Sequence, residues 1–498
     1  MPVFRRPAPD APVGDAIPFA HDGEYHLFFL SAPSDDSSWL HWRTRDFSTW
    51  TELPVAVPAD PDEGAAWTGS VIEREGVFHL FYTGSLAGSE TPQTVCRATS
   101  TDLVTFVRDT ANPVLVPDLD TFEAGDWRDP YVFFNSHEHL YWMVVAARRT
   151  SGPRRRRGCL ALATSPDLES WTLEPEPLYD PGTTYCPECP EIFAIGSTWY
   201  LVYSRFSENA ATVYRVAGSP RGPWRTPPHD ALDGRRWYAA KSLPVGDGTR
   251  RMGFGWIADR LGDTDGGAWR WGGDFALPRE IVEAEPGRLV VRLPDGVPEV
   301  GASVEVPDRV TLGRPGRTEH RFVDLDPSTV ERGYVLDCVL RPAADTAEFG
   351  LLLRTDDELT GYAVTFDRGR GTVALAAWPQ PVSPPWSETV ASETVASDAG
   401  ESKTAGSETL PGLEVDGPRL VERPVPGDDA EIRCRLVVEG SLVELFVTDG
   451  TGDIGGTGDG NDSIALSYRI YRRTGHELGF YAGDGVLQVG SVQVRGLR

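Results

Sequence analysis

Three acidic residues occupy equivalent places in a repeated pattern and together have the chemistry to cleave a glycosidic bond. Asp15, Asp129 and Glu188 each stand ten or eleven residues before the matching position of an aromatic-rich segment, and Thr68 and Lys241 hold that place in two further repeats. An ionised carboxylate can attack an anomeric carbon or activate water, while a second one with a raised pKa protonates the leaving oxygen. A third can bind sugar hydroxyls. The alternative, that each acid only caps a strand or pairs with an arginine, is disfavoured by finding three of them in one register.

The pattern that carries these residues consists of five aromatic-rich strands, whose equivalent positions lie 53 to 62 residues apart. The strands are 23–30, 76–84, 138–147, 197–204 and 250–258. Short strands and turns repeating at such a period are typical of a β-propeller. Because the first strand of each blade lines the central axis, one residue from each of five blades would converge on a single funnel.

A second repeated element predicts the outer part of each blade. Turns rich in Asp, Ser or Pro and ending in an aromatic residue lie at 45–50, 101–106, 165–171 and 219–224. Such turns lead from a third strand to an outermost one. Each blade is therefore predicted to have four antiparallel strands.

The loops that join second to third strands should return to the same end of the axis as the acids. They would bring Trp39 and either Trp269 or Trp271 to the rim, where aromatic faces can pack on sugar rings. The run 154–157, four arginines, would also lie near the mouth, as a solvated and ion-paired loop.

The pattern changes near residue 300 to longer alternating strands without the blade period. We therefore predict an all-β protein with a five-bladed propeller over 1–300 and a β-sandwich over 301–498. Within the sandwich, residues 380–417 are acidic and low in complexity, which predicts a disordered insertion. The glycine- and aspartate-rich stretch 449–463 is interpreted as a flexible hairpin loop.

The charge balance is strongly acidic, with 74 acidic and 47 basic residues and a formal net charge of −27. Only Lys241 and Lys403 are lysines. An acidic surface nearly free of lysine resembles the proteins of extreme halophiles, although a GC-rich genome also favours arginine. Nucleic acid is excluded as a partner, because its phosphates would meet a field of the same sign.

Cysteine usage and hydropathy give no sign of a metal centre or a membrane span. The pair Cys186 and Cys189 forms a single C-x-x-C without a second pair, so it is interpreted as structural and not as a zinc site. The N-terminal stretch lacks the apolar core of a secretory signal, and no run of 18 apolar residues occurs. We expect a cytoplasmic protein with no membrane partner and no metal or cofactor.

Several motifs resemble those of glycoside hydrolase family 32, the β-fructofuranosidases, invertases, levanases and inulinases. WRDPYVFF (127–134) resembles the family's R-D-P motif and PECPEIF (187–193) its E-C-P motif. WTGSVI (67–72) is similar to its F-S-G-S segment, and the C-terminal strands resemble its β-sandwich.

The resemblance implies a role for each acid. Asp15 would be the nucleophile, Asp129 the transition-state stabiliser and Glu188 the general acid/base, whereas Glu191, three residues on, falls on the opposite face of its strand. It further implies contacts to a β-fructoside, the only partner expected, from these side chains: Trp39, Trp67, Thr68, Arg128, Tyr238, Lys241 and Trp271.

The sequence departs from the family around the nucleophile and in the fifth blade. The family's W-M-N-D-P-N-G motif retains only Asp15, with Gly14 in place of Asn and 16–18 reading Ala-Ile-Pro, and Leu30 replaces a Gln. Lys241 stands where Gln is usual. Its ammonium group is expected to keep a nearby acid ionised, to bind a substrate oxygen or phosphate, or to serve a structural role.

The resulting hypothesis is a retaining hydrolase of β-fructofuranosidic bonds, acting on sucrose or short fructans through a covalent fructosyl-enzyme. Three alternatives stay open at this point. They are fructosyl transfer, an arabinosidase or xylosidase resembling family 43, and a sugar-binding propeller that has lost catalysis.

The acidic composition predicts that stability and activity rise with salt to about 1 M, where the Debye length falls to about 3 Å. Folding brings like charges together, and screening relieves part of that repulsion. The measurement is the melting temperature and turnover across a series of chloride concentrations. Full stability and activity in dilute buffer, unchanged by chloride, would contradict the halophilic interpretation.

Overall fold

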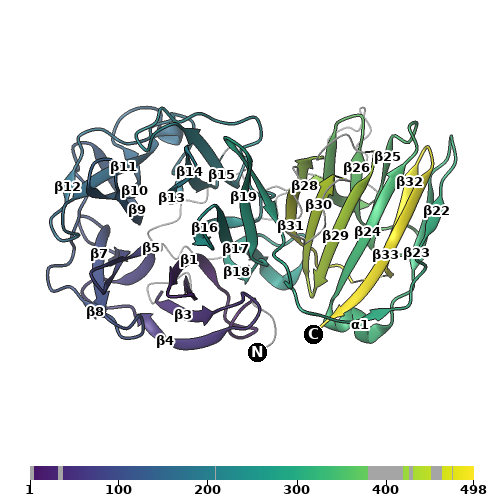
Figure 1. The fold of residues 1–498 in the computed structure, drawn as a ribbon, viewed down its shortest axis with the longest axis horizontal. Coiled ribbons are helices and arrows are strands. Elements are labelled where there is room, and N and C mark those ends of the chain that lie inside the picture. The colour runs from purple at the N-terminus through teal and green to yellow at the C-terminus, as the bar shows by residue number, and fades with distance from the viewer. Residues whose placement is uncertain are drawn as a thin grey trace, which may run out of the picture.

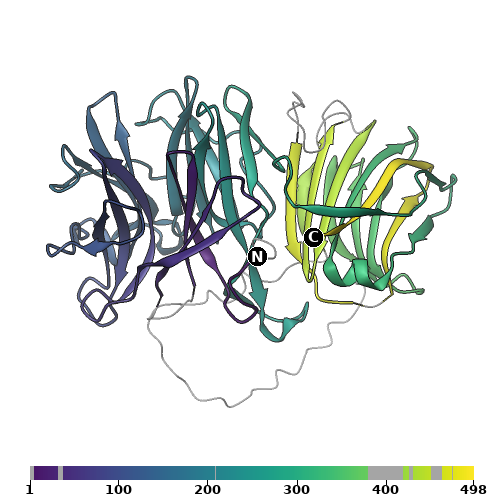
Figure 2. The same ribbon diagram turned by 60° about the horizontal axis from the view of Figure 1, so that its bottom comes forward.

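The computed structural model describes residues 5–31, 37–207, 209–378, 419–425, 430–449, 463–473 and 475–498. A ring of five β-sheets lies beside a sandwich of two larger sheets, an arrangement seen in both views (Figures 1 and 2). The predicted fold class, a five-bladed propeller followed by a β-sandwich, is confirmed.

The five blades follow one another along the chain, and within each blade neighbouring strands are antiparallel. Blade 1 holds β1 (Gly14–His21), β2 (Glu24–Leu30), β3 (Trp39–Thr44) and β4 (Thr51–Val57). Blade 2 holds β5 (Ala65–Arg74), β6 (Val77–Ser85), β7 (Gln93–Ser100) and β8 (Val107–Arg108). Blade 3 holds β9 (Phe122–Asn135), β10 (Leu140–Arg149), β11 (Gly158–Ser165) and β12 (Thr172–Leu173). Blade 4 holds β13 (Glu188–Ile195), β14 (Thr198–Arg205) and β15 (Ala211–Ala217). Blade 5 holds β16 (Tyr238–Val245), β17 (Arg250–Arg260), β18 (Trp269–Phe275), β19 (Arg279–Glu285) and β20 (Arg288–Arg292).

Two blades differ from the predicted four strands. In blade 4 only isolated bridges, Val213 to Ala231 and Val216 to Arg225, stand where an outermost strand was expected. In blade 5 the third strand is divided, because β18 pairs with the second half of β17 and β19 with its first half. Because β19 covers only the first half of β17, the end of β17 and its partner β18 can contact other parts of the molecule.

Three of the four predicted turns form through an aspartate that accepts backbone hydrogen bonds. Asp46 Oδ1 accepts from the backbone N–H groups of Ser48 and Thr49 at 2.9 and 2.7 Å. Asp102 and Asp167 do the same in blades 2 and 3. Such Asx turns need no partner from elsewhere in the chain, which explains why the local sequence was sufficient to predict them.

The first strands of the blades surround the axis. β1, β5, β9, β13 and β16 contact one another in ring order, and β16 closes the ring against β1. Val13 adds a backbone bridge to Gly273 of β18, which ties the start of the chain to blade 5. Side chains from all five blades are therefore held at fixed positions around one axis.

The sandwich is built from one seven-stranded and one six-stranded sheet. The first contains β21 (Val300–Val304), β22 (Val310–Leu312), β24 (Tyr334–Pro342), β29 (Ile432–Glu439), β30 (Leu442–Asp449), β31 (Ser463–Arg469) and β33 (Leu487–Leu497). The second contains β23 (Glu319–Val323), β25 (Glu348–Thr355), β26 (Gly361–Asp367), β27 (Thr372–Trp378), β28 (Arg419–Pro424) and β32 (His476–Gly483). The one α-helix in the described residues, α1 (Pro327–Arg332), precedes β24. The predicted insertion over 380–417 lies outside the described residues, as does most of the stretch 449–463.

The two parts share a continuous apolar core. Trp237, Ile257 and Leu277 of the propeller pack in one buried cluster with Val437 and Phe446 of the sandwich. Contacts of this kind join blade 5 to β31, which lies next to β17 and β20. No helix among the described residues is long and apolar enough to cross a bilayer.

A buried ionic network crosses the same interface. The fully buried Glu444 of β30 accepts hydrogen bonds from Arg279 of β19 at 2.5 Å and from Arg5 at 2.6 Å. Arg279 also pairs with Asp233 at 3.2 Å. The charges of the two arginines lower the pKa of Glu444, so the carboxylate stays ionised despite its burial.

Replacing Glu444 with Gln should lower the free energy of unfolding by about 3 kcal/mol or more, because two buried guanidinium groups each lose one of their two carboxylate partners. Glu439→Gln is the matched control, since Glu439 pairs with the same Arg5 at 2.7 Å but is partly exposed. It should cost less than about 1 kcal/mol. Denaturant unfolding of the two variants measures both effects, and equal losses would contradict this account of the network.

Candidate active site

The first strand of every blade is interrupted by a β-bulge near the same end of the axis. The register shifts at Asp15 in β1, at Thr68 in β5, beside Asp129 in β9, at Cys189 in β13 and at Ala239 in β16. Four of these residues have positive φ, namely Asp15 (34°), Asp129 (59°), Cys189 (50°) and Ala239 (49°). Bulges re-aim side chains, and a backbone conformation that is unfavourable for residues other than glycine is typical of functional sites.

The positions of the bulges show that the register predicted from the sequence was wrong in two blades. Asp15, Thr68 and Asp129 are equivalent, but the equivalent positions in blades 4 and 5 are Cys189 and Ala239. Glu188 therefore lies one residue earlier than expected, and Lys241 two residues later. Counting back from the second strand assumed hairpins of equal length, which the bulges do not preserve.

Asp15 is held by donors from two other blades. Thr68 Oγ1 donates to Asp15 Oδ2 at 2.6 Å, and the Trp256 indole N–H donates to Oδ1 at 3.0 Å. The Cys189 thiol lies 3.9 Å from Oδ2. Both carboxylate oxygens are thus fixed, which orients the side chain.

Asp129 is almost fully buried and is fixed by backbone groups. The Cys189 backbone N–H donates to Asp129 Oδ2 at 2.8 Å. The Asp129 backbone N–H donates to the Thr83 hydroxyl at 2.8 Å, and that hydroxyl donates to the Thr68 carbonyl at 3.0 Å. A chain of hydrogen bonds therefore links the bulges of blades 2, 3 and 4.

Glu188 stands just before the bulge of β13, as Arg128 does in β9 and Tyr238 in β16. Arg128 and Tyr238 are also its two hydrogen-bond donors. Arg128 donates to Glu188 Oε1 at 2.9 Å, and the Tyr238 hydroxyl donates to Oε2. Arg128 also pairs with Asp126 at 2.6 Å and donates to Gln93. The three residues before the bulges of blades 3, 4 and 5 thus form one connected group.

Burial and mutual repulsion raise the pKa values of two of the acids. Desolvation and the charge of Asp129 raise the pKa of Asp15 to about 7, against the hydrogen bonds from Thr68 and Trp256, which favour its ionised form. Burial also raises the pKa of Glu188, opposed by the Arg128 guanidinium and the Tyr238 hydroxyl. The structure therefore brings Asp15, Asp129 and Glu188 together, and burial favours the protonated forms of Asp15 and Glu188.

The tryptophans differ in their access to the site. Trp67 and Trp271 are partly exposed, and Trp271 lies so close to Gly14 that a Cβ atom there would meet its ring at 2.5 Å. Trp39 is fully buried, and its indole N–H donates to the Trp67 carbonyl at 2.8 Å. The prediction that Trp39 offers a face to sugar at the rim is wrong, because β3 turns it into the core between blades 1 and 2.

Lys241 is buried and does not reach the carboxylates through a hydrogen bond. Its ammonium group donates to the Gly69 carbonyl at 2.7 Å and lies 5.8 Å from the centre of the Tyr131 ring. With only 3 % of its surface exposed, it cannot bind a substrate phosphate. The interaction joins β16 to β5 across the axis, which agrees with the structural role among those considered.

Two other groups singled out in the sequence, Glu191 and the arginine run 154–157, belong to separate networks. Glu191 points into a separate buried network, where it binds Arg251 and Ser242. In blade 3, Arg157 pairs with Glu123 at 2.8 Å, as expected for an ion-paired loop. Among the described residues no three His, Cys, Asp or Glu side chains are arranged to hold a metal ion.

Sequence reasoning missed Trp256, Gln93 and the active-site role of Cys189. Trp256 lies in an aromatic strand that reads as core, and only its indole N–H reveals its function. Gln93 ends the loop between the second and third strands of blade 2, and such loops were expected at the same end of the axis as the acids. Its polar side chain at that place was a signal that the sequence offered. The contribution of Cys189 is its backbone N–H, which no side-chain pattern can show.

A five-bladed propeller with three carboxylates converging on its axis defines a class of carbohydrate-cleaving enzymes. The sequence model of the glycosyl hydrolases family 32 N-terminal domain matches residues 16–292, from the residue after Asp15 to the end of β20. The chain belongs to glycoside hydrolase family 32. The family 43 alternative is thereby overturned.

Relatives of known function agree with this assignment. The chain is 28% identical over 522 residues to raffinose invertase of Escherichia coli, covering 99% of this chain and 94% of that protein. It is 31% identical over 262 residues to sucrose-6-phosphate hydrolase of Salmonella typhimurium, a match that covers 47% of this chain and about half (53%) of that protein. The structure of fructan 1-exohydrolase IIa from Cichorium intybus with 1-kestose shares the fold, with a TM-score of 0.70, 17% identity and coverage of 99% and 97%.

Replacing Thr68 with Val should move the acidic limb of the pH dependence of kcat/KM upward from about 7, because it removes a hydrogen bond that lowers the pKa of Asp15. Activity that requires ionised Asp15 is then lost at a higher pH. Thr68→Ser keeps the hydroxyl and should retain the wild-type limb. A limb that stays at its wild-type value in Thr68→Val would show that Asp15 does not govern it.

Proposed function

We propose that this protein is a retaining β-fructofuranosidase that hydrolyses sucrose or short fructans. The observation that carries the proposal is the convergence of Asp15, Asp129 and Glu188 in a family 32 chain, each held by hydrogen-bond donors from other blades. Hydrolysis is proposed over transfer because no described feature of the site favours a second sugar over water.

In the first half-reaction Asp15 is the nucleophile. One oxygen of its ionised carboxylate attacks the anomeric carbon, and the bond from that carbon to the leaving oxygen breaks. Glu188 gives its proton to the leaving oxygen. The hydrogen bonds from Thr68 and Trp256 favour the ionised form of Asp15, so the nucleophile is ready at a pH above its pKa of about 7.

In the second half-reaction water replaces the leaving group. Glu188, now ionised, takes a proton from the water molecule, the water oxygen bonds to the anomeric carbon, and the bond to Asp15 breaks. Arg128 and the Tyr238 hydroxyl stabilise the carboxylate of Glu188 in this state. The raised pKa of Glu188 lets the same group serve as acid and then as base.

Asp129 binds the fructosyl unit without entering the covalent chemistry. Its buried carboxylate is fixed by the Cys189 N–H, and hydrogen bonds from fructosyl hydroxyls to it strengthen as positive charge develops on the ring. Trp67 and Trp271, both partly exposed, supply apolar faces for the sugar. Because Gly14 and Trp271 occupy the place of the family's Asn, selectivity here depends more on aromatic packing than on a side-chain amide.

A cytoplasmic setting is part of the proposal. All six cysteines are unpaired thiols, including Cys338 and Cys434, which face each other across neighbouring strands. Thiols so placed remain reduced in a reducing compartment. The net charge of −27 further supports a neutral sugar, and not nucleic acid, as the partner.

Asp15→Asn and Glu188→Gln should each lower turnover of sucrose by about 100-fold or more while the fold is retained, because each removes a group that enters the chemistry. An aryl β-fructoside with a good leaving group should restore fructosylation in Glu188→Gln, since no proton is needed there, but not in Asp15→Asn. Azide should partly rescue Asp15→Gly and give a product of inverted configuration.

Product analysis on sucrose separates hydrolysis from its alternatives. Wild-type enzyme should release glucose and fructose in equal amounts, with retained configuration when followed by NMR. Free glucose in excess over fructose would show transfer. Wild-type turnover in Asp15→Asn, or no release of fructose from sucrose, inulin or levan, would overturn the proposed function.

A further inference from the structure

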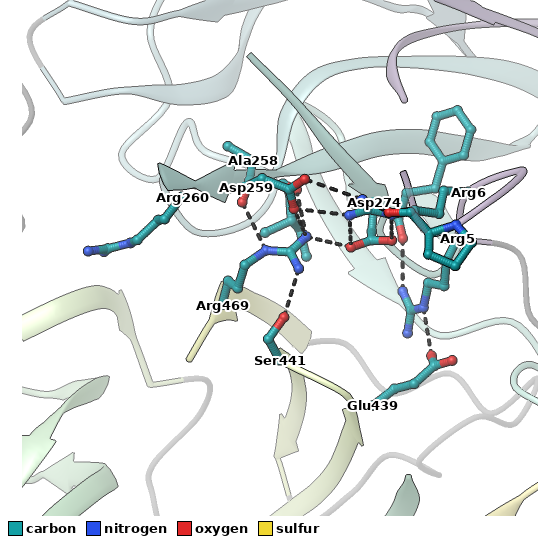
Figure 3. Close-up of polar contacts among 12 residues, drawn as sticks. Arg5, Arg6, Ala258, Asp259, Arg260, Asp274, Glu439, Ser441 and Arg469 are labelled. Atoms are coloured by element: carbon teal, nitrogen blue, oxygen red, sulfur yellow. Dashed lines mark hydrogen bonds and ion pairs between the residues drawn. The ribbon is translucent and has the colours of Figure 1, made fainter. Parts of the chain in front are cut away.

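Arg469 of the sandwich reaches into blade 5 directly behind the active site. This arginine ends β31, is only 4% exposed, and points between the ends of β17 and β18 (Figure 3). Its guanidinium Nε donates to the Ala258 carbonyl at 2.9 Å, and Nη2 donates to the Ile257 carbonyl at 3.1 Å. It is anchored on the sandwich side by the Ser441 hydroxyl at 2.7 Å.

The two carbonyls that Arg469 binds follow immediately after Trp256 in the chain. Trp256 is the residue whose indole N–H donates to Asp15 Oδ1 at 3.0 Å. Successive residues of a β-strand point to opposite faces, and Trp256 directly precedes Ile257 and Ala258. Holding the peptide groups of Ile257 and Ala258 therefore also fixes the Trp256 ring, which points to the axis. Among the described residues, Asp15 is the one hydrogen-bond acceptor of this indole.

Carboxylates of blade 5 keep the guanidinium group in place. Arg469 pairs with Asp274 of β18 at 2.6 Å and with Asp259 of β17 at 3.1 Å, and Arg6 pairs with the same two acids (Figure 3). Asp274 lies three residues after Trp271, whose ring packs against that of Trp256 with 5.6 Å between centroids. Both aromatic rings beside the nucleophile thus belong to strands that Arg469 holds.

We propose that Arg469 is a positioning residue of the active site, which holds the Trp256 indole on the nucleophile by fixing the peptide groups that follow it. Loss of the guanidinium group should let the end of β17 shift. The indole donor then leaves Asp15, although the sandwich and the propeller stay joined by their shared core and by the Glu444 network. The inference rests on the proposed role of Asp15.

The alternative is that Arg469 only joins the two parts of the molecule. Arg423 provides a matched comparison, since it is also a buried sandwich arginine that donates to a propeller carbonyl, that of Asp233. Asp233 lies in a loop before β16, away from Trp256. Removing either arginine costs interface stability, but only Arg469 should affect Asp15.

The pH dependence of Asp15 reports on the indole donor. The groups that face Asp15 come from every neighbouring first strand and from β17: Thr68, Asp129, Glu188, Cys189, Tyr238 and Trp256. Burial and the two acids raise the pKa of Asp15, while the Thr68 and Trp256 hydrogen bonds lower it. Loss of the Trp256 hydrogen bond therefore raises that pKa, and the acidic limb of kcat/KM moves to higher pH.

The test is a double-mutant cycle on full-length enzyme with sucrose, using Arg469→Met, Trp256→Phe and both together, with Arg423→Met as control. Arg469→Met and Trp256→Phe should each raise the acidic limb by about one pH unit and lower kcat, since a hydrogen bond to a charged group corresponds to a shift of that size. The double variant should shift no further than Trp256→Phe alone. Arg423→Met should lower the melting temperature with the limb unchanged.

Two results would overturn the inference. One is a folded Arg469→Met enzyme with the wild-type limb and kcat, and the other is a double variant whose shift is the sum of the single shifts. If Arg469→Met does not fold, Arg469→Lys decides, because an ammonium group cannot bind both carbonyls and both acids, so a smaller shift is still expected. Failure of the proposed function looks different: Trp256→Phe and Asp15→Asn would then both leave the profile unchanged.

Discussion

Repulsion among three carboxylates on one axis is the constraint that the rest of this structure satisfies. Asp15, Asp129 and Glu188 lie close enough for their charges to act on one another, and Asp129 is almost fully buried while Asp15 and Glu188 are half-buried. Like charges so placed stay together only when fixed donors face each of them. The donors come from other blades than the acids: blades 2 and 5 supply those of Asp15, blade 4 that of Asp129, and blades 3 and 5 those of Glu188. The site is therefore a property of the closed ring and not of any single blade.

The fold could be predicted because each blade is a local unit. Turns such as that at Asp46 form from neighbouring residues, and the aromatic strands repeat at a period that few architectures allow. The acids could be found because their residue types are rare on an apolar axis. What the sequence could not show is the bulge. Cys189 and Ala239 adopt positive φ without being glycine, so no residue type marks the position, and the register of blades 4 and 5 was displaced by one and two residues.

The contribution of aromatic residues was predicted least well, for a related reason. Trp39 and Trp256 are both buried in aromatic strands, yet the Trp39 indole donates to a backbone carbonyl and the Trp256 indole donates to the Asp15 carboxylate. The difference is the acceptor that each indole meets, and that acceptor lies in another blade. Long-range geometry of this kind is set only when the ring closes.

The near absence of lysine acquires a structural meaning at the domain interface. Arg469 and Arg279 each bind carboxylates and backbone or hydroxyl acceptors at the same time, which the planar, five-donor guanidinium permits and a single ammonium does not. Lys241 is the reverse case, because on the crowded axis it has one hydrogen-bond acceptor, the Gly69 carbonyl. At the interface arginine thus stands where several acceptors converge, whereas on the axis Lys241 stands where one compact donor fits.

Strand β18 shows how these constraints meet in one place. Gly273 is bridged to Val13, two residues before Asp15, while the next residue, Asp274, binds Arg6 and Arg469. Any movement of the sandwich against blade 5 is therefore transmitted both to the closure of the ring and to the strand that carries Asp15. Blade 4 also packs against the sandwich through the shared core, but the ion pairs of Arg469 are made to blade 5. Under the proposal made above for Arg469, the sandwich sets the position of the Trp256 indole and, through it, the geometry of the Asp15 carboxylate.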